Sequence, residues 1–150
     1  MTRRHTVARG HYDDFVHGYV TAMLWSSTDN SDESSGVEHL DANYGVEDIA
    51  RESMKKIKRD CAKFMKANKN ALNRYVSMIQ STSNDPGDWE MAGHDFWLTR
   101  NGHGTGFWDR DYLKPLPGLA SHDPGEELTK ASKKFGEVWP YVGDDGKVHV

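Results

Sequence analysis

The 150-residue sequence contains a single cysteine, Cys61, and no run of 18 apolar residues. One cysteine excludes an internal disulfide and a multi-cysteine zinc site, and Cys61 falls at an apolar position of a predicted helix, where we expect a buried thiol. The lack of a long apolar run argues against a membrane partner. The N-terminus also lacks the apolar stretch of a secretory signal, so we expect a cytoplasmic protein.

Composition indicates one globular domain. The formal charge is -4, with 28% charged and 36% hydrophobic residues. This composition is typical of a folded chain and not of a disordered one. The length suffices for one substantial core and is too short for two ordinary domains, so residues 1–150 are expected to form a single domain.

Apolar residues recur at helical spacing in the N-terminal half. They predict amphipathic helices over residues 11–25 and from Val46 to Lys66, and a third helix from Ala71 to Ile79. Between the first two helices, Ser26 to Tyr44 has the polar composition of a long loop. A further helix is expected over 124–135, opened by a capping box at Asp123 and ended by Gly136.

Two hairpins are expected in the C-terminal half. Residues 93–111 carry two tryptophans and two phenylalanines around Asn101-Gly102, a dipeptide suited to a type I′ turn. If Gly102-His103 centres the turn instead, Trp97 faces Trp108, and in either register both faces of the hairpin carry aromatics. The second hairpin would join Val138–Val142 to Lys147–Val150 through the turn at 143–146.

These elements predict an α+β fold, with N-terminal helices packed on a small antiparallel sheet of two hairpins and an intervening helix. The two hairpins are expected to share one sheet, because isolated hairpins are marginally stable in water. One aromatic face of the central hairpin would pack on the helices. The other would be covered by a loop or left for a partner.

Histidines and aspartates gather in the same region as the aromatic residues. Six of them fall within 29 residues: His94, Asp95, His103, Asp109, Asp111 and His122. A metal-dependent hydrolase or nuclease using His94, Asp95, His103 and Asp109 is therefore one alternative. Because no tight ligand spacing such as HExxH is present, we expect no metal, no cofactor and no enzymatic activity.

Charge is segregated along the chain. Eight acidic residues and one basic residue lie between Asp29 and Glu52, whereas eight basic residues and one acidic residue lie between Lys55 and Arg74. A basic helix face is more often solvated surface than a nucleic-acid site, and the overall acidic charge points the same way. A nucleic-acid-binding accessory protein is the second alternative.

The run from Gly93 to Gly104, continued by residues 106–110, resembles the motif of a family of small proteins encoded by bacteriophages and related mobile elements. Residues 24–29 (LWSSTD) and 141–147 (YVGDDGK) resemble two further stretches of that family. The family has no assigned reaction, so the resemblance implies no catalytic residue. It implies a setting in which small proteins often bind and divert host proteins, including defence nucleases.

Together, these features predict a phage or mobile-element accessory protein that binds a host or phage macromolecule in the bacterial cytoplasm without catalysing a reaction. The aromatic hairpin is its expected binding surface. The predicted partner-binding residues are Trp97, Arg100, His103, Trp108, Asp109 and Arg110. A host or phage protein is the expected partner, and nucleic acid is the alternative.

Overall fold

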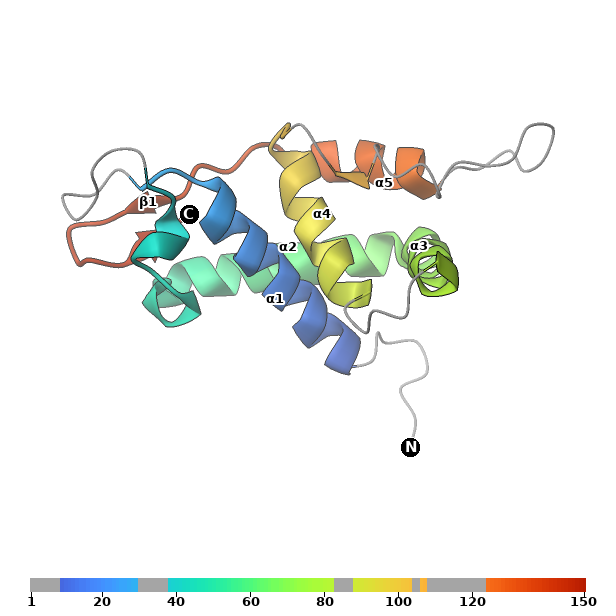
Figure 1. Ribbon diagram of the computed structural model, residues 1–150, viewed down its shortest axis with the longest axis horizontal. Helices are drawn as coiled ribbons and strands as arrows, with labels where there is room; N and C mark the ends of the chain where they lie inside the picture. The colour runs from blue at the N-terminus through green and yellow to red at the C-terminus, as the bar shows by residue number, and fades with distance from the viewer. Residues whose placement is uncertain (1–8, 30–37, 83–87, 104–105, 108–123) are drawn as a thin grey trace.

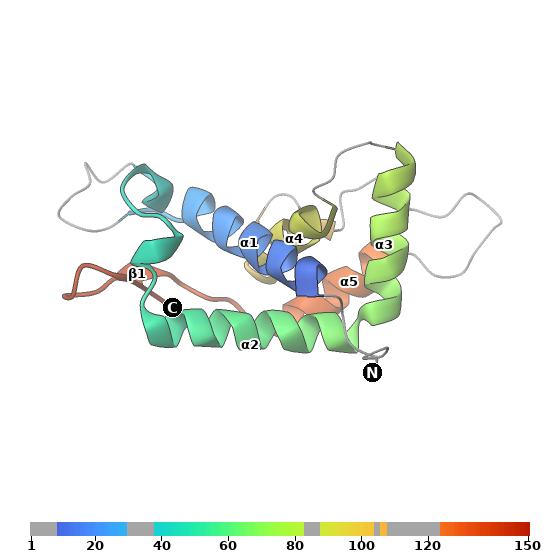
Figure 2. The ribbon, with the colours of Figure 1, turned by 90° about the horizontal axis from the view of Figure 1, so that it is seen from below.

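The computed structural model describes residues 9–29, 38–82, 88–103, 106–107 and 124–150. Most of these residues are helical (Figure 1). The elements are α1 (Arg9–Ser26), two short 3-10 helices (η1, Leu40–Ala42, and η2, Val46–Asp48), α2 (Arg51–Ala67), α3 (Lys69–Thr82), α4 (Asp88–Arg100), α5 (Pro124–Lys133), β1 (Tyr141–Val142) and β2 (Val148–His149). Figure 2 shows α3 at one end of α2 and the C-terminal hairpin at the other.

Helices α1 and α4 pack side by side at the centre of the molecule (Figures 1 and 2). Two glycines make this close approach possible. A Cβ atom on Gly93 would lie 1.9 Å from the Phe15 carbonyl oxygen, and one on Gly18 would lie 1.8 Å from the Glu90 carbonyl oxygen. No other residue type fits at either position without moving a helix backbone.

An aromatic cluster forms the core beneath this helix pair. Phe96 of α4 stacks on Phe64 of α2 with ring centroids 4.0 Å apart, and Phe15 of α1 lies 5.9 Å from Phe96. Phe107 contacts Tyr75 of α3 edge-on at 5.2 Å. The cluster therefore joins the first four helices through rings that are almost completely buried.

The predicted helices over 11–25, over 124–135 and from Ala71 to Ile79 are confirmed by α1, α5 and α3. The helix predicted from Val46 to Lys66 is confirmed only from Arg51, where α2 begins, because residues 46–48 form the separate 3-10 helix η2. In α2 the apolar stripe faces the core as its spacing requires, with Ile57, Cys61 and Phe64 buried. Cys61 is a buried free thiol, as expected. Gly136 follows α5 with φ +76°, which suits the end of a helix.

The predicted central hairpin is wrong. Residues 93–100, taken as its first strand, lie in α4, and residues 108–111 of its second strand lie outside the described residues. All six residues from Asp95 to Arg100 are buried. A helix that is covered on every side has no polar face, so it lacks the periodicity by which a helix is recognised in a sequence.

Gly102 has the positive φ predicted for it, 68°, but it ends a helix and does not turn a hairpin. Its N–H donates to the Thr99 carbonyl at 3.2 Å, and the N–H of His103 donates to the Leu98 carbonyl at 3.0 Å. These two bonds form a Schellman motif, which satisfies carbonyls that the last turn of α4 leaves unpaired.

The C-terminal hairpin is confirmed. β1 pairs with β2 in antiparallel register, Tyr141 opposite His149 and Val142 opposite Val148. Gly146 turns the chain with φ +76°. The fold is thus α+β in the broad sense, with a two-stranded sheet on a mostly helical body, but in the described residues the predicted sheet of two hairpins is reduced to one hairpin.

Across the described ranges, no helix combines the length and the apolarity needed to cross a lipid bilayer.

Candidate functional site

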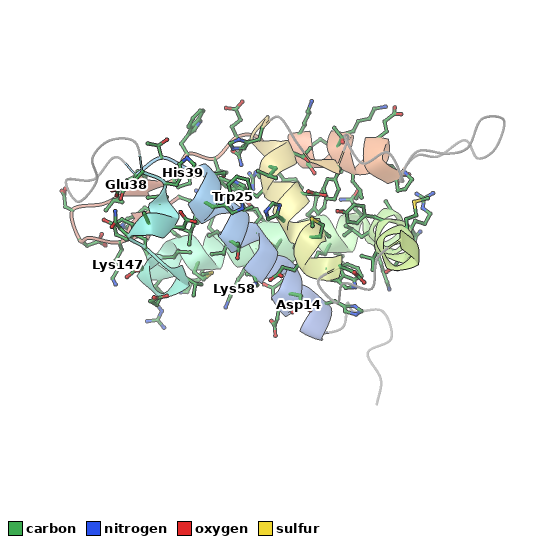
Figure 3. All side chains as sticks on the ribbon, in the orientation of Figure 1. Asp14, Trp25, Glu38, His39, Lys58 and Lys147 are labelled. Carbon is green, nitrogen blue, oxygen red and sulfur yellow. The ribbon has the colours of Figure 1, made fainter. Side chains whose placement is uncertain are left out.

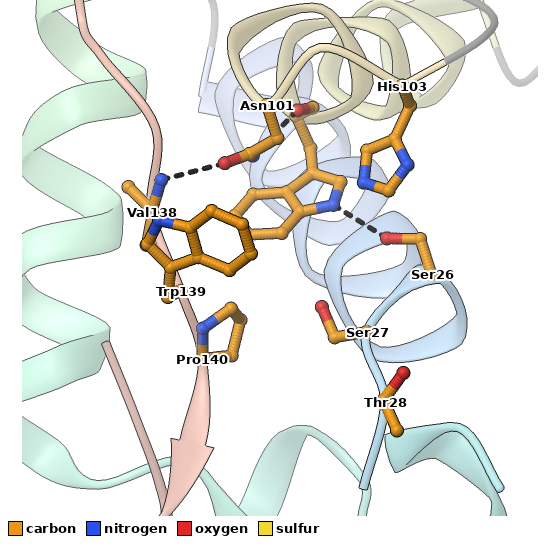
Figure 4. A pocket seen from close by; sticks show the side chains of 9 residues that line it. Ser26, Ser27, Thr28, Asn101, His103, Val138, Trp139 and Pro140 are labelled. Carbon is orange, nitrogen blue, oxygen red and sulfur yellow. Dashed lines mark hydrogen bonds between the residues drawn. The ribbon is translucent and has the colours of Figure 1, made fainter. Parts of the chain in front are cut away.

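One open pocket brings together three segments that are far apart in the sequence (Figure 4). Its volume is about 410 Å³. One wall is the end of α1 and the residues after it, and another is the extended segment that precedes β1. The third wall is α4 with its C-terminal turn. The lining residues are Ser26, Ser27, Thr28, Trp97, Asn101, His103, Val138, Trp139 and Pro140.

Two of the three distinctive stretches of the sequence contribute residues to the pocket. Ser26 to Thr28 belong to the first stretch, and Trp97, Asn101 and His103 belong to the second. The third wall, residues 138–140, directly precedes the third stretch. Two of the distinctive stretches, and a segment adjacent to the third, therefore line one concave surface.

Hydrogen bonds fix the pocket walls to one another. The indole N–H of Trp97 donates to Ser26 Oγ at 2.8 Å, which joins α4 to the end of α1. Asn101 Nδ2 donates to the Trp97 carbonyl at 2.9 Å, and Asn101 Oδ1 accepts from the backbone N–H of Val138 at 2.7 Å. These contacts hold the segment before β1 against the end of α4, as the dashed lines in Figure 4 show.

Arg100 provides a second connection behind the pocket, and its side chain is only 3% exposed. The guanidinium pairs with Asp60 of α2 at 3.0 Å and donates to the carbonyls of Phe135 and Gly136, each at 2.8 Å. It also donates to the Tyr19 hydroxyl at 3.2 Å. One buried cation thus links α1, α2 and α4 to the chain that leads into the pocket wall.

Trp139 is the most exposed large apolar side chain among the described residues, at 77%, and Tyr141 follows at 54%. The backbone on the N-terminal side of Trp139 is fixed by Asn101, and Tyr141 lies in β1. The indole is therefore displayed by a well-ordered segment beside the pocket. The imidazole of His103 and the hydroxyls of Ser27 and Thr28 line the same space.

The predicted partner-binding residues are distributed differently from expectation. Trp97 and Arg100 are buried and connect elements of the fold, and of the two only Trp97 lines the pocket. His103 is half-buried and lines the pocket. Trp108, Asp109 and Arg110 lie outside the described residues. That these six residues bind a partner stays a prediction.

The predicted hydrolase residues are not brought together where the structure describes them. His94 lies in the middle of α4, where its Nε2 accepts a hydrogen bond from the indole N–H of Trp25 at 3.0 Å. Asp95 is buried and accepts from the Tyr75 hydroxyl at 2.5 Å. His103 lies beyond the end of the helix, and Asp109 is outside the described residues. Among the residues placed, no three His, Cys, Asp or Glu side chains gather as a metal site would require.

Burial also changes two potentially reactive groups. It raises the pKa of the Cys61 thiol far above its ordinary value, and the nearby Asp60 carboxylate adds to the effect. It raises the pKa of the Tyr19 hydroxyl as well, although the positive charge of Arg100 opposes the rise. Both groups therefore stay protonated at neutral pH.

The sequence patterns assigned no binding role to several residues of the pocket, although Ser26, Ser27 and Thr28 lie within the distinctive stretch 24–29. Ser26, Ser27 and Thr28 belong to the predicted polar loop, and Trp139 was assigned only to a strand. The proline that follows Trp139 was a usable signal, because proline marks an edge or irregular strand, where an aromatic side chain is more easily left exposed.

No protein-family model, no curated protein and no solved structure matches this chain.

Proposed function

We propose that this chain is a non-enzymatic accessory protein of phage or mobile-element origin that captures a host or phage protein through the pocket beside Trp139. The observation that carries the proposal is the 77% exposure of the Trp139 side chain next to an open pocket of about 410 Å³. The resemblance to a phage family of the two stretches that line the pocket supports the biological setting, including a counter-defence role.

An exposed tryptophan is a strong candidate for the centre of a binding surface. Tryptophan is enriched among the residues that contribute most to protein–protein affinity, because its large ring removes much apolar area from water when a partner covers it. Here the half-buried Pro140 lies next to Trp139 and lines the same pocket wall. The resulting apolar surface is the kind that marks an interaction site.

The site is also ordered before a partner arrives. Asn101 holds the backbone of Val138 at 2.7 Å, and Arg100 holds the carbonyl of Gly136 at 2.8 Å. Binding would therefore cost little additional conformational entropy in the segment that carries Trp139. This arrangement favours tight binding from a small contact area.

The chemistry of the pocket fits a peptide segment of a partner protein. The Trp139 ring and Pro140 offer apolar contact, while the Ser27 and Thr28 hydroxyls and the His103 imidazole can hydrogen-bond to peptide groups. A partner loop that inserts one apolar side chain beside Trp139 would use both kinds of contact.

The test is affinity purification of the tagged protein from phage-infected host cells, followed by titration calorimetry with the purified partner. We expect one stoichiometric partner protein that binds the wild-type chain and is lost with Trp139→Ala. Tyr141→Ala is the matched control, because it removes an exposed ring from the same segment without touching the pocket lining. Equal capture by Trp139→Ala and the wild type would refute this site.

A further inference from the structure

Helix α2 is unusually basic for a chain with an overall negative charge. Its 17 residues contain seven of the 19 basic residues of the protein and only two acidic residues. The basic residues are Arg51, Lys55, Lys56, Lys58, Arg59, Lys63 and Lys66. The net charge of the whole protein is -4, so the remainder of the molecule is strongly acidic.

The fold turns all seven cations to the outside. Ile57, Cys61 and Phe64 fix the buried side of α2, and every basic residue of the helix is exposed. No described helix or strand covers this side of α2. In Figure 2 the helix runs along the lower edge of the molecule, and in Figure 3 the Lys58 side chain extends from it. These seven residues are called the α2 basic face below.

The two acidic residues of α2 do little to neutralise this face. Asp60 is directed toward the core side, where it pairs with the buried Arg100 at 3.0 Å. Glu52 lies in the first turn and contacts Lys55 at 3.4 Å. The outer surface of the helix therefore presents seven positive charges and one negative charge over about 25 Å, given the rise of an α-helix.

We propose that the α2 basic face binds the sugar–phosphate backbone of a nucleic acid. The charge is complementary to a row of phosphates, and a straight helix anchored by its buried side holds the cations in a fixed line. Five of the seven cations are lysines, which bind phosphates as point charges without reading bases. The binding is therefore independent of base sequence.

The composition of the face favours nucleic acid over an acidic protein. The centre of a protein interface is depleted of lysine and is built around apolar or aromatic side chains. The exposed apolar residues of α2 are only Ala62 and Ala67. The face offers a partner protein no large apolar side chain to bury. Binding of a phosphate backbone depends on charge and does not require such a side chain.

The first experiment measures fluorescence anisotropy of a labelled 20-base-pair DNA duplex with the full-length protein at 50 and 200 mM NaCl. If three phosphates are neutralised, the affinity should fall about 40-fold between these salt concentrations. An RNA duplex of the same length should behave similarly, because the contacts are to phosphates. No binding to either duplex at 50 mM NaCl would overturn the proposal.

Two charge-matched double variants locate the binding surface. Arg59→Glu with Lys63→Glu reverses two exposed charges on the α2 basic face, and Lys133→Glu with Lys134→Glu makes the same change in net charge at the C-terminal end of α5. We expect the first pair to weaken duplex binding at least tenfold and to flatten the salt dependence, and the second pair to change it less than twofold. An equal loss in both pairs would assign binding to net charge alone and contradict the proposed face.

Two further measurements complete the test. Polyglutamate should bind at least tenfold more weakly than the duplex at 50 mM NaCl, and comparable binding would favour an acidic protein partner instead. Trp139→Ala should bind the duplex as the wild type does, because the pocket is not part of the α2 basic face. Thermal melting followed by circular dichroism confirms that each variant is folded.

Discussion

Trp97 and Trp139 line the same pocket but serve opposite purposes. Trp97 is 1% exposed, its N–H donates to Ser26, and its ring lies edge-on to Tyr19 at 5.3 Å. Trp139 is 77% exposed, and its backbone rather than its ring is fixed. The comparison teaches that the distinctive stretch in α4 forms the buried wall of the pocket. The exposed aromatic side chain comes from the less conspicuous segment before β1.

The largest expected effect lies on the buried side of this comparison, at the crossing of α1 and α4. Gly93→Val would place a branched side chain against the backbone of Phe15, where a single Cβ is already 1.9 Å from the carbonyl oxygen. Because backbone cannot rotate out of the way, we expect a loss of more than about 5 kcal/mol, enough to unfold the protein. Denaturant unfolding monitored by circular dichroism measures it.

Gly10→Ala is the matched control for this prediction. Gly10 lies in α1, the helix against which Gly93 of α4 packs, but a Cβ on Gly10 would meet nothing within 4 Å. Alanine is favoured over glycine in helices by up to about 1 kcal/mol, so stability should be unchanged or slightly raised. Similar destabilisation by both variants would show that the helix crossing is not the cause.

The second prediction sets the two tryptophans directly against each other. Trp97→Ala should cost about 3–5 kcal/mol, because it leaves a large cavity in the core. Trp139→Ala should cost less than about 0.5 kcal/mol, because the ring contributes little to the folded core. Urea titration of both variants gives the two values. Comparable costs would mean that Trp139 is also structural and would remove it as a binding residue.

A smaller effect is expected at the hydrogen bond between the pocket walls. Ser26→Ala leaves the buried indole N–H of Trp97 without its acceptor, which should cost about 1–2 kcal/mol. Ser27→Ala is the control, because Ser27 lines the same pocket without this bond. The difference in melting temperature between the two variants isolates the contribution of the bond.

The smallest effect belongs to the exposed C-terminal hairpin. The pKa of Asp145 lies below its ordinary value, first because the His149 side chain hydrogen-bonds to the carboxylate and then because the Lys147 N–H does. A lowered pKa stabilises the folded state above the unfolded pKa of about 3.9, and this contribution disappears as pH falls through the folded value. In His149→Phe, a titration followed by nuclear magnetic resonance should show the Asp145 pKa rising toward its ordinary value. An unchanged pKa would contradict the role of His149.

Much of the fold could be predicted because most elements have one exposed side. The apolar stripe that continues to Met65 indicated α2, although α2 begins at Arg51 and not at Val46, and the Gly143–Gly146 turn indicated the C-terminal hairpin. The sequence of α4 carries no such pattern, because its neighbours cover the half from Asp95 to Arg100 on every side. Gly102 was correctly expected to have a positive φ, but that geometry serves both a hairpin turn and the end of a helix.

The site was predicted only in part. The motif at 93–104 was identified as special, and His103 from it lines the pocket. The direction in which its aromatic residues point depends on whether the segment is a strand or a helix, so Trp97 was misplaced with it. The serines after α1 and Trp139 enter the site through tertiary contacts that local sequence does not encode.

Arg100 connects helix α2 to the chain that precedes Trp139. Its guanidinium reaches Asp60 on α2 and the carbonyls of Phe135 and Gly136, a few residues before Trp139. Arg100 thus connects the helix that carries the α2 basic face to the segment that leads into the pocket, although no side chain belongs to both surfaces. Loss of the Asp60 carboxylate would remove one of the four partners that hold the Arg100 guanidinium beside the segment leading to Trp139.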